Sequence, residues 1–272
     1  MRTGPGDDHA ERAAEAIRAT GAAPPLVAII TGSGLGAATS GIEPEAELSF
    51  GELPGFPTST VPGHEGRLVL GRLAGIAVVA FRGRLHHYEG HPMSLVTLPT
   101  RLAAELGARS LISTAAVGGI DPLLEAGSLV VGTDHINFLG ENPLRGWRDE
   151  NGRPPFVDAT HAYDPDLAEL AMSCASELGI PAASGVYAAM PGPTYETPTE
   201  IEFLKRAGAS VVGMSVVPEA LASAALGMRF AGLFCVTNAA GVEPVDHLDV
   251  IETAEGFARH LGDLLGMMLP KL

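Results

Sequence analysis

Short apolar runs alternate with helical patterns along the whole chain, and this alternation most constrains its fold. Apolar runs predict buried strands over residues 26–31, 67–73, 76–81, 111–113, 128–133, 185–190, 210–214 and 230–237. Helical spacing predicts helices over 8–19, 92–106 with a kink at Pro99, 166–178, 199–207, 218–226 and 248–268. Because no linker or repeat divides the chain, we predict one α/β domain over residues 1–272, in which residues 1–24 form an N-terminal helix and loop.

Charge and cysteine content narrow the possible partners and the compartment. The 272 residues carry a formal net charge of −15, so we expect no broad electrostatic grip on nucleic acid or on a membrane surface. Cys174 and Cys235 lie in apolar segments without metal-type spacing, which predicts buried free thiols in a reducing compartment. No stretch has the pattern of a secretory signal or a membrane span. We therefore expect a soluble cytoplasmic protein.

The glycine-rich segment after the first predicted strand is a candidate anion cradle. In Gly32-Ser33-Gly34-Leu35-Gly36, glycines let the backbone N–H groups and the Ser33 hydroxyl face an anion. A dinucleotide fingerprint fits poorly, because the spacing is GxGxG and no acidic residue ends a second strand about 20 residues later. Taken alone, the segment favours a plain tight turn. His64, alone in another glycine turn, is more typical of a structural or exposed histidine.

Residues 82–91 form the densest polar cluster of the chain and directly follow a predicted strand. Arg84 can grip phosphate with a two-pronged hydrogen bond, His86 can donate to the same anion, and Glu89 can orient that histidine. A solvated basic loop is the simpler alternative. We predict no metal site among the histidines here, because a glycine and a proline break the helical spacing and no HExxH motif occurs.

Other predicted strand ends carry groups suited to a flat heterocycle. The stiff loop over residues 190–197 presents Tyr195 beside Glu196, a pair that can stack on a ring and accept its N–H bonds. The same loop can equally be a helix entry with a capping role, and both interpretations stay open. Ser215 and Asn238 also follow predicted strands. Ligands of α/β folds bind at the carboxyl ends of strands. The glycine-rich segment 32–36, the polar cluster 82–91 and the residues named here all follow predicted strands, so we predict that together they form a ligand site.

The chain resembles a known family, the trimeric purine nucleoside phosphorylases, to which the methylthioadenosine phosphorylases are related. The resemblance runs from about Leu26 to the final predicted helix and rests on several motifs in the same order. The segments that carry it are Thr31-Gly-Ser-Gly-Leu-Gly36, Val61-Pro-Gly-His64, Gly83-Arg-Leu-His-His-Tyr-Glu-Gly90, Asp134-His-Ile-Asn137, Asn142-Pro-Leu-Arg-Gly146, Gly192-Pro-Thr-Tyr-Glu-Thr197, Gly213-Met-Ser215 with Pro218-Glu219, and Thr237-Asn238.

The resemblance implies a fold and a role for each matching residue. The implied fold is a central mixed, partly barrel-like β-sheet flanked by helices. The implied phosphate ligands are Ser33, His64, Arg84, His86, Ser215 and the backbone of Ala116. The implied contacts to sugar and base are Tyr88, Tyr187, Tyr195, Glu196, Val212, Met214, Asn238 and His247. Catalysis would rest on His86, Glu196 and Asn238, and Phe156 resembles an aromatic residue lent by a neighbouring subunit, which implies a homotrimer.

The implied reaction is phosphorolysis of purine ribo- and deoxyribonucleosides to the free base and ribose 1-phosphate. Inorganic phosphate is the co-substrate, and no metal or cofactor is implied. Asn238 and His247 favour 6-oxopurines with a 5′-hydroxyl, because methylthioadenosine phosphorylases place an aspartate where Asn238 stands. Ala115 and Val117 depart from the family pattern near the base. The alternative of a phosphorylase for 5′-methylthio nucleosides therefore stays open.

Overall fold

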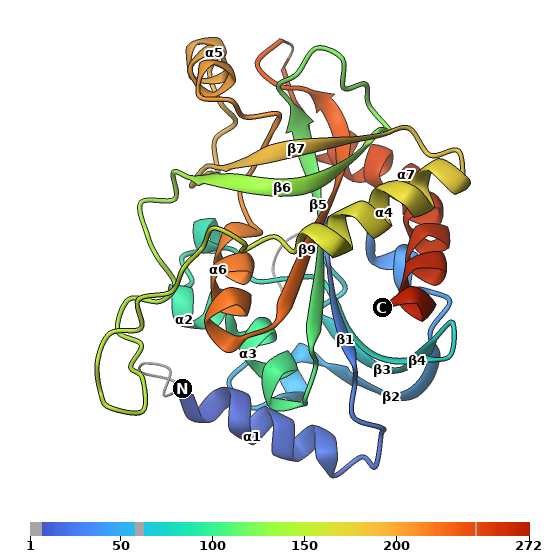
Figure 1. The fold of residues 1–272 in the computed structure, drawn as a ribbon, viewed down its shortest axis with the longest axis vertical. Helices are drawn as coiled ribbons and strands as arrows, with labels where there is room; N and C mark the ends of the chain where they lie inside the picture. The colour runs from blue at the N-terminus through green and yellow to red at the C-terminus, as the bar shows by residue number, and fades with distance from the viewer. Residues whose placement is uncertain (1–6, 58–62, 243) are drawn as a thin grey trace.

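Within the described residues, 7–57, 63–242 and 244–272, the computed structural model forms one mixed sheet of nine strands (Figure 1). The strands are β1 (Val27–Thr31), β2 (Glu43–Ser49), β3 (Arg67–Leu73), β4 (Ile76–Arg82), β5 (Ser110–Gly119), β6 (Leu129–Asn137), β7 (Ala182–Ala189), β8 (Val211–Gly213) and β9 (Arg229–Ala239). Their order is β2-β3-β4-β1-β5-β8-β7-β6-β9, and β9 also pairs with β5. Strands β5, β8, β7, β6 and β9 therefore close a barrel, from which the other four extend as an open wing.

Helices cover both faces of this sheet and pack against it in two apolar clusters, one on each face (Figure 1). On one face lie α1 (Asp7–Arg18), α2 (Met93–Val96), α3 (Leu98–Glu105) and α6 (Val217–Leu226). On the other lie α4 (Pro165–Glu177) and α7 (His247–Met268), whereas α5 (Pro198–Arg206) stands at the end of the barrel. Short 3₁₀ helices span Gly36–Thr39, Phe50–Glu52, His87–Glu89 and Leu269–Lys271. Within the described residues, no helix is long and apolar enough to cross a membrane.

The mixed, partly barrel-like sheet between helices is confirmed, and the deviations from the predicted elements have local causes. The helix expected over 92–106 is split at Thr97, just before Leu98 and Pro99. The strand expected at 111–113 begins at Ser110 and continues through Gly118 and Gly119. There β5 pairs with β8 on one side and, after a register shift at Gly118, still with β9 on the other, and a Cβ on Gly118 would come within 3.0 Å of the Ala240 Cβ. The limits of the predicted domain stay a prediction.

Strand β2 was not anticipated because its sequence, EPEAELS, carries little apolar signal. It forms one edge of the wing, pairs only with β3, and leaves its charged side chains largely exposed. Edge strands are often charged because charge discourages pairing with another chain. Residues 140–163 form a long irregular segment that contains no helix or strand of the sheet.

Candidate active site

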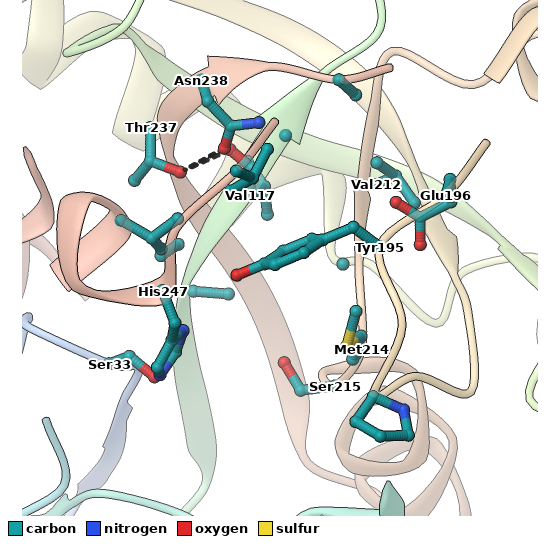
Figure 2. Close-up of a pocket in the computed structure, with 18 of the residues that line it drawn as sticks. Ser33, Val117, Tyr195, Glu196, Val212, Met214, Ser215, Thr237, Asn238 and His247 are labelled. Atoms are coloured by element: carbon teal, nitrogen blue, oxygen red, sulfur yellow. Dashed lines mark hydrogen bonds between the residues drawn. The ribbon is translucent and has the colours of Figure 1, made fainter. Parts of the chain in front are cut away.

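A cavity of about 510 Å³ opens at the carboxyl ends of β1, β4, β5, β8 and β9 (Figure 2). Its volume is in the range typical of small-molecule sites. The predicted site residues that line it are Ser33, Arg84, His86, Tyr88, Ala116, Tyr195, Glu196, Val212, Met214, Ser215, Asn238 and His247. Helix α7 contributes the last of these from its first residue, and the loop before α5 contributes Tyr195 and Glu196. The convergence expected from the strand ends is therefore present.

At one end of the cavity, the guanidinium of Arg84 is held on its inner side by three partners. Its Nε donates to Glu219 Oε1 at 2.9 Å, and its Nη2 donates to Ser113 Oγ at 2.9 Å and to the Thr114 carbonyl at 2.8 Å. Its Nη1 donates to Ser215 Oγ at 3.2 Å. Arginine carries five N–H donors in a rigid fork, so these contacts fix the group and leave the Nη1 edge directed at Ser215.

The segment that carries Ser215 is held in a conformation that is rare for its residues. Val216 has φ +64° and ψ −53°, and the N–H of Val217 donates to the Ser215 carbonyl at 2.7 Å, which makes a γ-turn. Such a backbone costs on the order of 1–3 kcal/mol and persists only where the surroundings enforce it. Here Tyr187 contributes, because its hydroxyl oxygen accepts the Ser215 N–H at 3.1 Å. Ser215 Oγ is thus placed beside Arg84.

His64 and Ser33 form a second pair with defined donor and acceptor roles. The backbone N–H of Arg84 donates to His64 Nδ1 at 3.2 Å, so this nitrogen is an acceptor. Burial, with help from the nearby positive groups, holds the pKa of His64 well below its usual value, and the ring is neutral. Its proton therefore sits on Nε2, which lies 3.0 Å from Ser33 Oγ and donates to it. The Ser33 hydroxyl hydrogen remains for an anion.

Gly83 makes the approach of the His64 ring possible. A Cβ at this position would lie 2.9 Å from both Cβ and Nδ1 of His64, and the backbone φ is +116°. Any other residue would push the imidazole away from the Arg84 N–H and strain the chain. The glycine preceding Arg84 is therefore part of the geometry that orients Ser33.

His86 is oriented by the carboxylate of Glu89. Both the backbone N–H and Nδ1 of His86 lie within hydrogen-bond distance of Glu89 Oε1, at 2.8 and 3.1 Å. Burial lowers the pKa of His86, although the hydrogen bond with Glu89 opposes this shift. The Tyr88 ring stacks on the imidazole with 4.5 Å between ring centroids. With Nδ1 occupied by the carboxylate, Nε2 is the nitrogen left for a ligand, as predicted for an oriented histidine.

Glu196 lines the cavity on the side away from Ser33 (Figure 2). Its Oε1 is buried and has no hydrogen-bond partner among the residues that the structure describes. Burial raises the pKa of this carboxyl above its usual value. A buried oxygen without a partner costs free energy, and such a group in a cavity is suited to accept a hydrogen bond from a ligand.

Asn238 faces the same end of the cavity and is oriented by its neighbour. The Thr237 hydroxyl lies 2.9 Å from Asn238 Oδ1 and 3.2 Å from the Val117 carbonyl, and Figure 2 shows the first of these contacts. In this orientation of the amide, Oδ1 faces the Thr237 hydroxyl and the amide nitrogen of Asn238 is left to serve a ligand. Val117 and Ala115, the two residues that depart from the family pattern, both line the cavity.

Comparison with known proteins gives the family. The family model of the phosphorylase superfamily matches residues 26–269. The chain is 45% identical to purine nucleoside phosphorylase 1 of Bacillus subtilis (strain 168) over 251 residues, which are 91% of this chain and 93% of that protein. It belongs to the purine nucleoside phosphorylases of the phosphorylase superfamily. The resemblance inferred from the motifs is thereby confirmed.

Other purine nucleoside phosphorylases match over similar lengths. The mouse (Mus musculus) enzyme is 37% identical over 258 residues, 91% of this chain and 89% of that protein. Isoform 2 from Schistosoma mansoni, solved in complex with cytosine and ribose-1-phosphate, has a TM-score of 0.90 and 36% identity, and the match covers 97% of this chain and 96% of that one. A Schistosoma mansoni enzyme in complex with hypoxanthine gives a TM-score of 0.90 at 32% identity, with 97% of each chain covered.

Three residues to which the phosphorylase resemblance gave roles lie outside the residues that line the cavity: His64, Tyr187 and Phe156. His64 Nε2 is hydrogen-bonded to Ser33 Oγ, and the hydroxyl of the fully buried Tyr187 accepts the Ser215 N–H. Phe156 is 97% exposed in the long irregular segment. Direct contact of these three side chains with a substrate stays a prediction.

Sequence reasoning gave no role to two buried partners of Arg84, Ser113 and Glu219. Both bind Arg84, and Ser113 Oγ also donates to Glu219 Oε2. One signal was present in the chain: Glu219 is the only charged residue in the apolar segment 211–226. A lone charge in such a segment is buried only when it is paired, so it points to a cation elsewhere in the fold.

Proposed function

We propose that this purine nucleoside phosphorylase acts on 6-oxopurine ribo- and deoxyribonucleosides, which it splits with inorganic phosphate into base and ribose 1-phosphate. One observation carries the proposal: hydroxyl and guanidinium donors converge at one end of a cavity whose other end holds a carboxylate oxygen without a partner among the described residues. Phosphate fits the first end and an N–H of the base fits the second.

The end of the cavity that carries Ser33, Ser215 and Arg84, the anion end, can hold phosphate below the sugar. Ser33 and Ser215 each already accept a hydrogen bond, from His64 and Arg84 respectively. Their hydroxyl hydrogens are therefore left to donate to phosphate oxygens, together with the Nη1 edge of Arg84. His86 Nε2, with Glu89 behind the ring, can hold the proton of monohydrogen phosphate. Fixed donors lower the barrier because they need no reorganisation when the sugar–base bond breaks.

The end of the cavity that carries Glu196 and Asn238, the base end, can hold and stabilise the leaving purine. As the C1′–N9 bond breaks, the sugar becomes cationic and the purine gains negative charge, while a phosphate oxygen forms the new bond to C1′ with inversion. The Asn238 amide nitrogen can donate to N7 of the purine. Glu196 can accept the N1–H that a 6-oxopurine has and a 6-aminopurine lacks. The carboxylate therefore favours hypoxanthine and guanine over adenine.

The sugar lies between these ends, and its 5′ position separates the proposal from the alternative. Tyr88, Met214 and His247 line the cavity, and His247 can bind a 5′-hydroxyl. Val245 and Val250 line the cavity with this histidine. These two apolar side chains favour the second candidate function, phosphorolysis of 5′-methylthio nucleosides, because a methylthio group packs against them.

A nucleoside panel assayed with and without phosphate tests the reaction and its specificity. We expect hypoxanthine release from inosine that requires phosphate, persists in excess chelator and yields ribose 1-phosphate, because phosphate itself is the nucleophile and no metal or cofactor takes part. Adenosine should be a much poorer substrate. Cleavage of inosine at the same rate without phosphate would contradict the proposal, and faster turnover of methylthioinosine than of inosine would favour the alternative.

We also propose that the chain assembles as a homotrimer in which Phe156 completes the sugar site of a neighbour. A large aromatic side chain that is 97% exposed has no packing role within its own chain. Light scattering should give a mass of three times 28.0 kDa. Phe156→Ala should raise the KM for inosine roughly 3- to 10-fold, the loss of one aromatic contact, whereas Leu178→Ala should not. A monomer, or an unchanged KM in Phe156→Ala, would contradict this assignment.

A cytoplasmic location and a role in purine salvage complete the proposal. Cys174 and Cys235 are both free and buried, a state that suits a reducing compartment. Intracellular nucleosides are the substrates available to such an enzyme. Fractionation of cells that express the tagged chain tests the location.

A further inference from the structure

The buried pair of Arg84 and Glu219 is the feature of this site that the proposed reaction leaves unexplained. The two side chains are only 2% and 3% exposed, and their atoms Nε and Oε1 lie 2.9 Å apart. A carboxylate close to an anion site repels the anion, so it opposes phosphate binding. Buried ion pairs also add little net stability compared with apolar residues of the same size. Charge balance and fold stability alone therefore do not account for a glutamate here.

The hydrogen bonds of the guanidinium indicate what the carboxylate contributes. Glu219 engages both Nε and Nη2, at 2.9 and 3.4 Å, and so grips one edge of the planar fork. Ser113 accepts from Nη2 and donates to Glu219, which ties the carboxylate to the same edge. Among the described residues, Nη1 has one partner, Ser215 Oγ. The hydrogen bonds that Glu219 and Ser113 make to Nε and Nη2 thus determine that the Nη1 edge faces the cavity.

The two residues that hold this edge of the guanidinium come from separate elements of the core. Ser113 lies on β5, in the middle of the sheet, and Glu219 lies in the first turn of α6. Helix α6 begins directly after the γ-turn that places Ser215. One short segment therefore carries both the serine that shares the anion end with Arg84 and the carboxylate that orients the arginine. Sites held by rigid elements keep donors in place without reorganisation.

We propose that Glu219, braced by Ser113, is a positioning residue that holds the Arg84 guanidinium with its Nη1 edge towards phosphate. The inference rests on the proposed function, since phosphate is the anion concerned. The role is geometric: the length of the glutamate side chain, and not only its charge, sets the orientation of the guanidinium. A counter-charge without this role would tolerate a shorter acid at the same position.

The test is Glu219→Asp, which keeps the charge and shortens the side chain by one methylene. We expect the KM for phosphate, and the Kd for inorganic phosphate in titration calorimetry, to rise roughly 10- to 100-fold, as for a donor misplaced by about 1 Å. The KM for inosine should stay within about threefold, because the base and sugar contacts are untouched. Ser113→Ala should shift the same two phosphate quantities in the same direction by a smaller factor. The double variant should lose less than the product of the two, since both act on one guanidinium.

Ser223→Ala is the matched control. Ser223 lies one turn further along α6, is fully buried, and its Oγ has no hydrogen-bond partner among the described residues. Its removal should leave phosphate binding unchanged. A folded Glu219→Asp protein with wild-type phosphate affinity would overturn the proposal, as would equal increases in both KM values. If Glu219→Asp does not fold, Ser113→Ala with unchanged phosphate affinity would overturn it. Calorimetry reads phosphate binding without turnover, so a wild-type protein that binds phosphate but does not cleave inosine would contradict the reaction and not the positioning role.

Discussion

Replacing Glu196 by alanine is expected to lower kcat/KM for inosine by roughly 10- to 100-fold, the loss of one hydrogen bond between the base and a charged group. The Glu196 Oε1 is buried in the cavity without a partner among the described residues, so it can serve the base without breaking another bond. As an acceptor of the N1–H, the carboxylate gains no strength when negative charge develops on the purine, so it holds the base about equally before and during cleavage. The loss should therefore appear mainly in KM.

The same substitution should not destabilise the protein. A buried carboxylate oxygen without a partner costs free energy in the unliganded protein, so its removal should leave the melting temperature unchanged or raise it. Glu202→Ala is the control, because Glu202 lies on the exposed face of α5 and only pairs with Arg206. That variant should retain full activity. A Glu196→Ala enzyme within threefold of wild type on inosine would remove Glu196 from the base site.

The variant Glu196→Gln tests recognition of the N1–H of the base separately from the shape of the side chain. The amide keeps the shape of the side chain but loses the charge that favours a donor on the base. We expect the ratio of kcat/KM for inosine to that for adenosine to fall, because adenosine has no N1–H to lose. An unchanged ratio would mean that another group sets the base preference.

The positions of the cavity residues could be predicted, because the prediction needed only the ends of strands. Ser33, Arg84 and Asn238 each follow an apolar run, and parallel strands bring their carboxyl ends to one edge of a sheet. The structure places all three on one cavity. No comparable pattern in the chain marks Ser113, which is a small polar residue inside a buried strand.

The orientation of those residues could not be predicted, because it depends on contacts between distant segments. The tautomer of His64 follows from a backbone N–H twenty residues away, and the edge that Arg84 presents follows from Glu219, 135 residues away. The positive φ of Val216 breaks the local rule for a β-branched residue. Such violations of local preference cluster where a fold holds groups in place for chemistry.

Replacing Arg84 by methionine should affect both activity and stability, for separate reasons. Phosphate loses its charged ligand, so phosphate-dependent cleavage of inosine should fall by more than about 10³-fold, beyond the loss of one neutral donor. Glu219, 3% exposed, would be left buried without a cation. Breaking one side of a buried pair costs about 3–5 kcal/mol, so the melting temperature should drop clearly.

The double variant Arg84→Met with Glu219→Leu separates these two losses. Both charges are then gone and apolar side chains fill the space, a change that is often neutral or stabilising for buried ion pairs. The melting temperature should recover most of the loss, whereas activity should stay as low as in Arg84→Met. Recovery of activity would show that Arg84 is not the phosphate ligand. A double variant as unstable as the single one would show that the cost lies in lost packing around Ser113 and Thr114, and not in the stranded carboxylate.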